Sequence, residues 1–317
     1  MTTTATPVAE RSGARPQGST PKSRKRPVSE TTRQQARMGR VFISLYTALL
    51  VVFGLAPALY ALVLAFTDEA GFAGFDNFIG IFNDYRFWPA VTNVASFLAL
   101  WLVVQTVFVV LLALIVHQIS VRWIGAVARF VYYIPGAFAG AASVMVWLFL
   151  LDPAVSPVSG LLTSMGFDSF VQTVEQGNLP WIFMIIAFWT GAGQWIVIMY
   201  GALNGINPEV IEAARVDGAG IFHTAVKVQI PLLKKWIAYM AVMCLAAGAQ
   251  LFVEPRVLSQ ASKGVVPEDY SLNQLVYLYA FRQGDYHGSA ALSIMLLVVS
   301  LLLASVFVFK GGLFDRD

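Results

Sequence analysis

Residues 92–116 read TNVASFLALWLVVQTVFVVLLALIV, a stretch that contains no Asp, Glu, Lys or Arg. A helix needs about 20 mostly apolar residues to cross the roughly 30 Å hydrocarbon core of a lipid bilayer. This stretch is long enough and apolar enough to meet that requirement. It therefore predicts a transmembrane helix, and it sets the class of protein in which the rest of the chain is interpreted.

Five further apolar runs lie before and after this one. They cover residues 41–66, 126–151, 181–206, 236–253 and 289–309. Each is long enough to span a bilayer, although the fifth is short and is expected to extend by a residue or two. The composition agrees, because 57% of the residues are hydrophobic and only 12% are charged, against roughly 25% charged residues in soluble domains. We predict an all-α integral membrane protein with about six transmembrane helices.

The segment before the first run, residues 1–40, is rich in Ser, Thr, Pro and Arg and has few large apolar residues. It cannot bury enough apolar surface to fold alone, so we predict a disordered basic tail, followed by a transmembrane domain over residues 41–317. The apolar run after the tail is too long for the core of a cleavable signal peptide. Two roles are open for the tail: it binds anionic lipid, or its charge only sets the topology.

The basic residues divide unevenly between the two sides of the predicted membrane. Seventeen of the 21 Lys and Arg residues fall on the side that holds both termini, and four fall on the other side. Short cytoplasmic connections are enriched in Lys and Arg. We therefore predict a multi-pass protein of the cell (plasma) membrane with both termini in the cytoplasm. The connection between the fourth and fifth runs, residues 207–235, falls on the same side.

This loop has clear helix-start and helix-stop signals. Asn207 is a favourable N-cap, Pro208 suits the first helical position, and Glu209 lies at the positive end of the helix dipole. The helix is expected to end at Asp217 and Gly218, since glycine adopts the left-handed conformation that follows many helices.

A second amphipathic stretch covers residues 221–230, and Pro231 is expected to break it before the fifth span. The loop is therefore predicted to be a helix–turn–helix at the membrane surface. Ala213 and Ala214 are small enough to let the backbone of a partner approach closely.

The loop also matches a known spacing, E-A-A-x₃-G-x₉-I-x-L-P. The matching positions, with conservative changes at the Ile and Leu sites, are Glu212, Ala213, Ala214, Gly218, Val228, Ile230 and Pro231. This pattern resembles the ATPase-docking loop of the permeases of binding-protein-dependent ABC importers. The alternative is a surface hairpin that only links two spans.

Outside the loop, the chain is similar to the carbohydrate-importing, maltose-transporter-like (type I) branch of that family. The shared stretches include Ile134-Pro135, Trp189-Thr190-Gly191 and Tyr277–Phe281. One departure lies after the fifth run, where many relatives have a Gly-Gly-Pro turn and this chain reads Ser259–Gly264.

The resemblance implies a type I permease fold with a cytoplasmic coupling helix. The residues that would couple it to the ATPase are Glu212, Ala213, Ala214, Asp217, Gly218 and Pro231. The implied partners are a second permease subunit, an ATP-binding subunit dimer, an extracytoplasmic solute-binding protein and the lipid bilayer, with no nucleic acid. ATP and Mg²⁺ would be bound by the partner ATPase subunits, and no cofactor is expected in this chain.

The sequence shows no means by which this chain alone would power transport, which agrees with a permease that depends on a separate ATPase. The sequence contains no Gly-x-x-x-x-Gly-Lys-Ser/Thr phosphate loop, so we expect a transport subunit without its own ATPase site and not an enzyme. Ion-coupled transporters usually carry carboxylates or histidines inside their spans. None is evident within the predicted runs, which disfavours a stand-alone secondary transporter. No nucleophile–base, paired-carboxylate or metal-ligand pattern points to a membrane enzyme.

The resemblance also suggests where the solute passes. Positions that contact sugar in maltose-type permeases correspond here to Gly136, Gly140, Thr190, Gly191, Cys244, Gly248 and Leu251. Gln194 and Gln250 are the nearest polar side chains that could replace contacts missing from this chain. Helix packing through small residues is an equal alternative for the glycines. The expected function is import of a disaccharide or oligosaccharide, and import of a glycerol-phosphate-type solute is the alternative.

Overall fold

The structure is a computed structural model that describes residue 2 and residues 30–119, 121–138 and 140–310. The chain divides into two compact units, Met1–Pro57 and Ala58–Asp317.

The first unit is helical in its described part. Helix α1 (Glu30–Leu50) continues into a π-helical segment, η1 (Val51–Leu55). Helix α1 starts before residue 41, so it includes residues 30–40 of the segment that was predicted to be a disordered tail. Residues 30–40 contain Gln, Ala, Arg and Met, which favour helix, and they extend an existing span without the cost of a new nucleus. The rest of the predicted tail, residues 1–29, lies outside the described residues except for residue 2.

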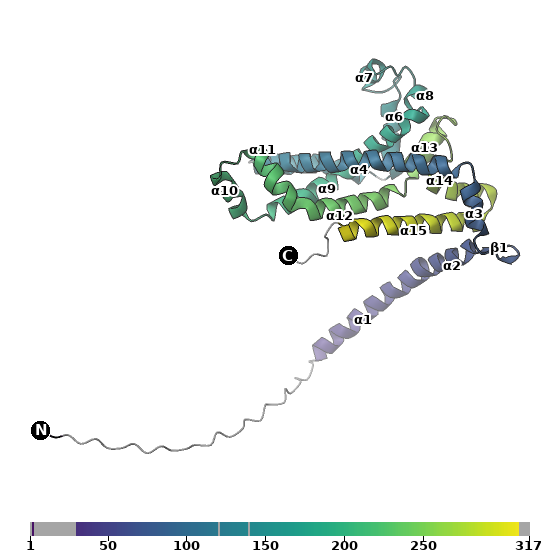
Figure 1. Ribbon diagram of the computed structural model, residues 1–317, viewed down its shortest axis with the longest axis horizontal. Helices are drawn as coiled ribbons and strands as arrows, with labels where there is room; N and C mark the ends of the chain where they lie inside the picture. The colour runs from purple at the N-terminus through teal and green to yellow at the C-terminus, as the bar shows by residue number, and fades with distance from the viewer. Residues whose placement is uncertain (1, 3–29, 120, 139, 311–317) are drawn as a thin grey trace. The chain divides into compact units, whose positions relative to one another are not determined.

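The second unit is built around four long helices that lie side by side (Figure 1). These are α4 (Phe87–Gln118), α9 (Leu179–Asn204), α12 (Ile230–Gly248) and α15 (Tyr286–Lys310). Helix α2 (Ala56–Ala65) leads into the unit and completes the first apolar run. In the described residues, five helices are long and apolar enough to cross a membrane, or six if one bent pair is a single span. The prediction of about six spans is confirmed.

The bent pair is the third apolar run, which is not one uninterrupted helix. Helix α5 (Arg122–Tyr133) passes through a 3₁₀ turn, η2 (Ile134–Ala137), and α6 (Gly140–Leu151) leaves at 100° to it. Pro135 has no backbone N–H to donate, and its ring disfavours a continuous α-helix. The run of apolar residues predicted one span here and did not predict the bend.

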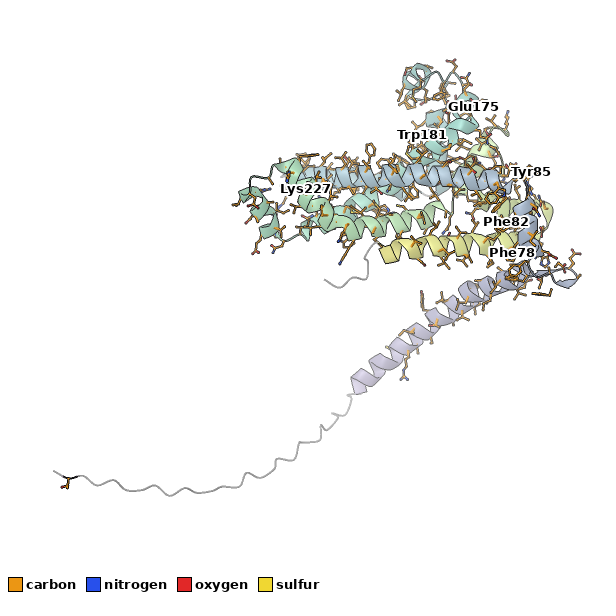
Figure 2. The ribbon with its side chains drawn as sticks, in the orientation of Figure 1. Phe78, Phe82, Tyr85, Glu175, Trp181 and Lys227 are labelled. Atoms are coloured by element: carbon orange, nitrogen blue, oxygen red, sulfur yellow. The ribbon has the colours of Figure 1, made fainter. Side chains whose placement is uncertain are left out.

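Short elements connect the long helices at both ends of the bundle. At one end lie the hairpin β1 (Thr67–Asp68) and β2 (Gly71–Phe72), α3 (Asp76–Asn83), α7 (Ser159–Ser164), α8 (Phe170–Thr173), η3 (Gln176–Asn178), α13 (Val253–Ala261), α14 (Leu272–Tyr277) and η5 (Leu278–Gln283). At the other end lie α10 (Pro208–Val216), α11 (Ile221–Thr224) and the π-helical η4 (Ala225–Gln229). Figure 2 shows Lys227 at the end of the bundle opposite Phe78, Phe82 and Tyr85.

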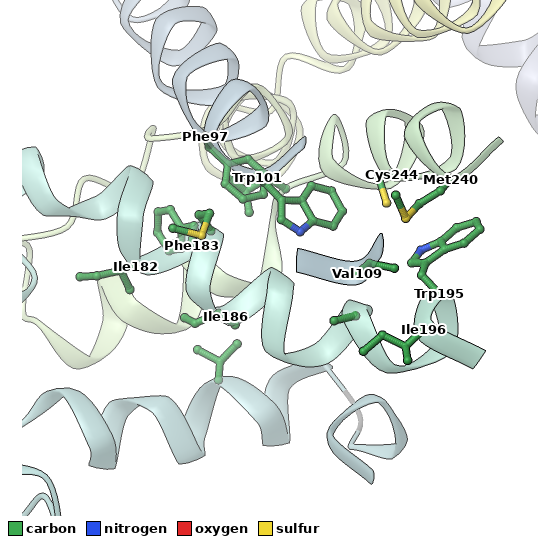
Figure 3. Packing of buried hydrophobic residues seen from close by; sticks show 14 of the residues in the cluster. Phe97, Trp101, Val109, Ile182, Phe183, Ile186, Trp195, Ile196, Met240 and Cys244 are labelled. Atoms are coloured by element: carbon green, nitrogen blue, oxygen red, sulfur yellow. The ribbon is translucent and has the colours of Figure 1, made fainter. Parts of the chain in front are cut away.

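The pattern of burial is that of a membrane helix bundle. Along α4, the side chains of Phe97, Trp101 and Val109 are buried among α9 and α12, as Figure 3 shows. On another face of α4, a stripe at four-residue spacing is apolar and exposed: Val103, Val107, Leu111 and Ile115. Residues four apart lie on one helix face. An apolar outer face of this length suits lipid or another transmembrane subunit and is unsuited to water.

Candidate functional site

The loop at one end of the bundle begins with the predicted cap. The Asn207 side chain accepts a hydrogen bond from the Glu209 N–H at 3.1 Å, and Pro208 occupies the first turn of α10. The cap satisfies one of the backbone N–H groups that a helix start leaves without a partner. The start of α10 is therefore specified locally by these three residues, as the sequence indicated.

The end of α10 is a Schellman turn centred on Gly218. Its φ of +83° lies in the left-handed region. The Gly218 N–H donates to the Arg215 carbonyl at 3.0 Å, and the Ala219 N–H donates to the Ala214 carbonyl at 2.9 Å. These two bonds satisfy carbonyl groups that the last helical turn leaves free. The predicted helix stop at Asp217–Gly218 is confirmed in its geometry.

The loop presents most of its predicted coupling residues to the outside. Glu212, Ala213, Asp217, Gly218 and Pro231 are exposed, while Ala214 is half-buried.

Between them lies an apolar tip that the sequence reasoning did not single out. It consists of Val216, Ile221 and Phe222, whose exposed fractions are 87%, 72% and 82%. Exposed apolar groups beside polar ones mark surfaces that bind other proteins. The signal was present in the sequence, since three large apolar residues flank a glycine turn in a polar loop.

Pro231 does not break the chain's path into the fifth span, so that prediction was wrong. The helix runs without interruption over Ile221–Gly248. The residues just before Pro231 form the π-helical turn η4, in which the Ile230 N–H donates to the Ala225 carbonyl. A π-turn is wider than an α-turn, and Pro231 then falls in the first turn of α12, where its missing N–H has little cost. The π-helical turn therefore accommodates Pro231, and the helix continues past it.

A cavity of about 500 Å³ lies between α4, α9 and α12. It brings together eight of the nine predicted pathway residues: Gly136, Thr190, Gly191, Gln194, Cys244, Gly248, Gln250 and Leu251. Gly140 is not one of the residues that line it, and a Cβ on Gly140 would meet Val253, which forms part of the cavity wall, at 3.8 Å. Figure 3 shows Trp101, Trp195 and Cys244 directed toward one another from three different helices.

The cavity glycines divide into two groups. A Cβ on Gly136 would lie 2.8 Å from the Thr190 carbonyl oxygen, and a Cβ on Gly248 would lie 2.7 Å from the Trp101 ring. These two glycines permit close helix packing, which was the alternative role considered for them. At Gly191 a Cβ would be at an ordinary distance of 3.8 Å from Trp101 and Gln105. Gly191 therefore leaves space beside two polar side chains.

Aromatic side chains form much of the cavity wall, and sequence reasoning missed them. Trp101 stacks on Phe97 with ring centroids 5.6 Å apart and an interplanar angle of 11°. Trp195 and Tyr133 also line the cavity. Nothing in the sequence separates these aromatic residues from the many others in the spans, because their convergence depends on how α4, α5 and α9 pack.

Sequence reasoning also missed Glu254 as a cavity residue. The sequence places it at the edge of the fifth run, but it lines the cavity from the first turn of α13, outside the candidate spans. Burial raises the pKa of its carboxyl group above the ordinary value, since a low-dielectric environment disfavours the charged form. The cavity thus combines aromatic rings, amide side chains and one carboxyl group.

Comparison with known proteins gives a consistent family. The family model described as "Binding-protein-dependent transport system inner membrane component" matches residues 110–316. The chain is 28% identical to the diacetylchitobiose uptake system permease protein NgcF of Streptomyces coelicolor, over 95% of this chain and 89% of that protein. It is 26% identical to the sn-glycerol-3-phosphate transport system permease protein UgpA of Escherichia coli, over 81% of this chain and 88% of that protein.

The fold has a match among solved structures. A chain of a bacterial ABC transporter involved in the import of the acidic polysaccharide alginate superposes with a TM-score of 0.77 at 20% sequence identity. The superposition covers 91% of this chain and 100% of that chain. At this level of identity the match concerns the arrangement of helices alone.

Proposed function

Since the chain belongs to the family of binding-protein-dependent transport system inner membrane components, we propose that it is the permease subunit of an ATP-driven sugar importer. In this proposal the chain forms one half of the translocation pathway. A second permease subunit forms the other half, a solute-binding protein delivers the sugar from outside, and a dimer of ATP-binding subunits supplies the energy.

The observation that carries the proposal is the continuous helix that joins the loop to the cavity. Residues 221–248 form one helix of about 42 Å at 1.5 Å per residue. Its first residues belong to the exposed apolar tip, and its last turns carry Cys244 and Gly248 in the cavity wall. A rigid helix transmits a displacement of one end to the other. Movement of the loop by an ATPase would therefore change the cavity directly.

The loop surface suits a protein partner. Val216, Ile221 and Phe222 supply apolar contact area, and Glu212 supplies an exposed carboxylate on the same side of the turn. In the proposed complex, the apolar tip enters a groove of the ATPase and Glu212 pairs with a donor at its rim. This assignment requires the loop to lie in the cytoplasm, which is the side that the distribution of Lys and Arg favours.

The cavity suits a sugar of disaccharide size. Ligand sites of about 300–1,000 Å³ are lined mainly by apolar and aromatic groups with a few placed polar groups, and this cavity of about 500 Å³ fits that description. Trp101, Trp195 and Tyr133 offer ring faces to the C–H surfaces of a sugar. Gln194 and Gln250 offer amide donors and acceptors to its hydroxyl groups.

A glycerol-phosphate-type solute is a second candidate. The observation in its favour is the 26% identity to the glycerol-3-phosphate transport permease over 88% of that protein. The two candidates differ in charge, since a glycerol phosphate is anionic and an unmodified sugar is neutral, so the charge of the cavity distinguishes them.

The test is reconstitution of the chain with its partner subunits in proteoliposomes. We expect uptake of a labelled disaccharide that requires ATP on the side of the α10–α11 loop, and we expect the isolated chain neither to bind nor to hydrolyse ATP. Glu212→Ala should insert at normal levels and lose most of the uptake. Tight ATP binding by the isolated chain, or full uptake by the Glu212 variant, would contradict the proposal.

A further inference from the structure

The charge of the cavity is carried by a single side chain. Among the lining residues that the structure describes, Glu254 is the only one that carries a carboxyl, ammonium, guanidinium or imidazole group. The others are apolar, aromatic or uncharged polar residues. The described part of the cavity wall therefore contains one carboxyl group and no Lys, Arg or His.

Glu254 has no cation to balance it in the described part of the chain. The nearest basic residue along α13 is Arg256, whose guanidinium group lies over the Tyr277 ring at 4.8 Å from the ring centre. Residues two apart on a helix do not face each other. Burying an unpaired carboxylate costs free energy, so packing within the chain gives no reason for an acid at this position.

Further polar groups without a partner are buried beside the cavity. The indole N–H of Trp101 and both amide atoms of Gln105 are buried, and none of them bonds to a described residue. Only 1% of Gln105 is exposed. The space left by Gly191 lies beside both side chains, since a Cβ there would be 3.8 Å from Gln105 Nε2 and from the Trp101 ring. Buried polar groups are nearly always hydrogen-bonded, but Gln105 does not line the cavity, and these atoms are closed off from a solute in this arrangement of the helices.

We propose that Glu254 sets the charge preference of the cavity: it admits neutral and amine-bearing sugars and excludes sugars that carry a carboxylate or phosphate. This inference rests on the proposed function, because it assumes that the cavity holds the transported sugar. Glu254 accepts hydrogen bonds from hydroxyl groups or pairs with an ammonium group, while Gln194 and Gln250, which also line the cavity, offer amide groups to the rest of the sugar. A phosphate or carboxylate group would face Glu254 in a medium of low dielectric, where repulsion between like charges is strong.

The test uses three β-1,4-linked disaccharides of one size and three charges. They are the glucose disaccharide (neutral), the glucosamine disaccharide (cationic) and the glucuronate disaccharide (anionic). Binding of each labelled sugar is measured by equilibrium dialysis at pH 7.5 on the assembled importer in nanodiscs. The solute-binding protein is omitted, so that its own selectivity does not contribute. We expect the anionic sugar to bind at least about tenfold more weakly than the neutral sugar, and the cationic sugar to bind at least as tightly as the neutral one.

Two variants locate the effect. Glu254→Gln keeps the shape and removes the charge, and it should bring the three affinities to within about threefold of one another. Glu268→Gln removes one acid from the exposed Glu268–Arg282 ion pair, which lies outside the cavity wall. This control should leave the charge series unchanged.

The outcomes separate the inference from the proposed function. If none of the three sugars binds, the assignment of the cavity to sugars fails. If all three bind equally to the wild-type complex, the sugar site stands and the charge preference is wrong. If the preference persists in Glu254→Gln, or disappears equally in Glu268→Gln, Glu254 does not determine it. Only loss of the preference in the Glu254 variant alone supports the inference.

Discussion

Gly218 is the residue on which the geometry of the loop depends most directly. It takes a φ of +83°, and a Cβ built on it would meet no atom within 4 Å. A substitution there is therefore strained by backbone conformation and not by crowding. Gly220, two residues later, also has open space around it, but its φ is −69°. The two glycines form a matched pair that separates backbone strain from side-chain size.

We expect Gly218→Val to displace α10, since a β-branched residue at positive φ costs about 1–3 kcal/mol. The variant should insert at near-normal levels and lose most of its transport, whereas Gly220→Val should retain it. Disulfide cross-linking from Ala213→Cys to the ATPase subunit measures docking, in a background that lacks Cys244. The cross-link should form in that background, weaken with Gly218→Val and persist with Gly220→Val. Normal transport by the Gly218 variant would mean that the loop is only a connector.

At the scale of elements, an ion pair and a phenol connect the α3–α4 junction to η5. Arg86 donates to Asp84 at 2.6 Å, and the Tyr279 hydroxyl donates to the same carboxylate at 2.5 Å. The Arg86 guanidinium group also lies over the Tyr279 ring, 5.4 Å from its centre. These residues come from segments almost 200 positions apart in the chain. The cluster therefore holds the α3–α4 junction against η5 at the end of the bundle opposite the coupling loop.

Removing the Tyr279 hydroxyl should weaken the contact between η5 and the α3–α4 junction. A hydrogen bond to a charged group contributes about 1.5 kcal/mol or more, so Tyr279→Phe should lower the midpoint of thermal unfolding of the detergent-solubilised chain. Tyr85→Phe is the matched control, because Tyr85 is exposed and its hydroxyl does not hydrogen-bond to Asp84. A fluorescence-detected unfolding scan compares them. Equal midpoints for the two variants would show that the hydroxyl is not stabilising.

The same cluster predicts how stability depends on pH. The hydrogen bonds from Arg86 and then Tyr279 hold the pKa of the Asp84 carboxyl well below its usual range, against the opposing effect of burial. A carboxyl group whose pKa is depressed by folding stabilises the protein above its unfolded pKa of about 4, and this contribution is lost as the pH falls toward the folded-state pKa. Unfolding midpoints should therefore drop below about pH 4, and they should drop less in Asp84→Asn than in the wild type.

At the scale of the whole molecule, the two ends of the bundle differ in chemistry. One end carries the α10–α11 loop with Arg215, Lys227 and Lys234. The other end carries most of the acidic residues that the connections contain, including the Asp84 cluster and Glu268. The positive-inside rule assigns the first end to the cytoplasm. This orientation remains a prediction and can be tested with single cysteines.

In a Cys244→Ala background, a membrane-impermeant maleimide applied from outside should label Ser164→Cys and Gln260→Cys but not Ala213→Cys. All three positions are exposed, so accessibility depends on the side of the membrane and not on burial. Permeabilised cells should label all three, which provides the positive control. Labelling of Ala213→Cys in intact cells would reverse the orientation and remove the argument for ATPase docking.

Local sequence was enough to predict the membrane class, the number of spans and the shape of the α10 loop, because these depend on short-range properties. An apolar run of sufficient length partitions into lipid wherever it occurs, and Asn207 and Gly218 act on backbone groups within a few residues of themselves. The spaced motif of the loop also led to the family.

Tertiary packing decided the rest. The bend of the third run, the continuous path through Pro231 and the convergence of Trp101, Trp195 and Glu254 each depend on tertiary structure. Such contacts join residues far apart in the chain, and no local pattern specifies them. For the same reason the sequence did not reveal that Glu254, which follows the fifth run directly, lines the cavity.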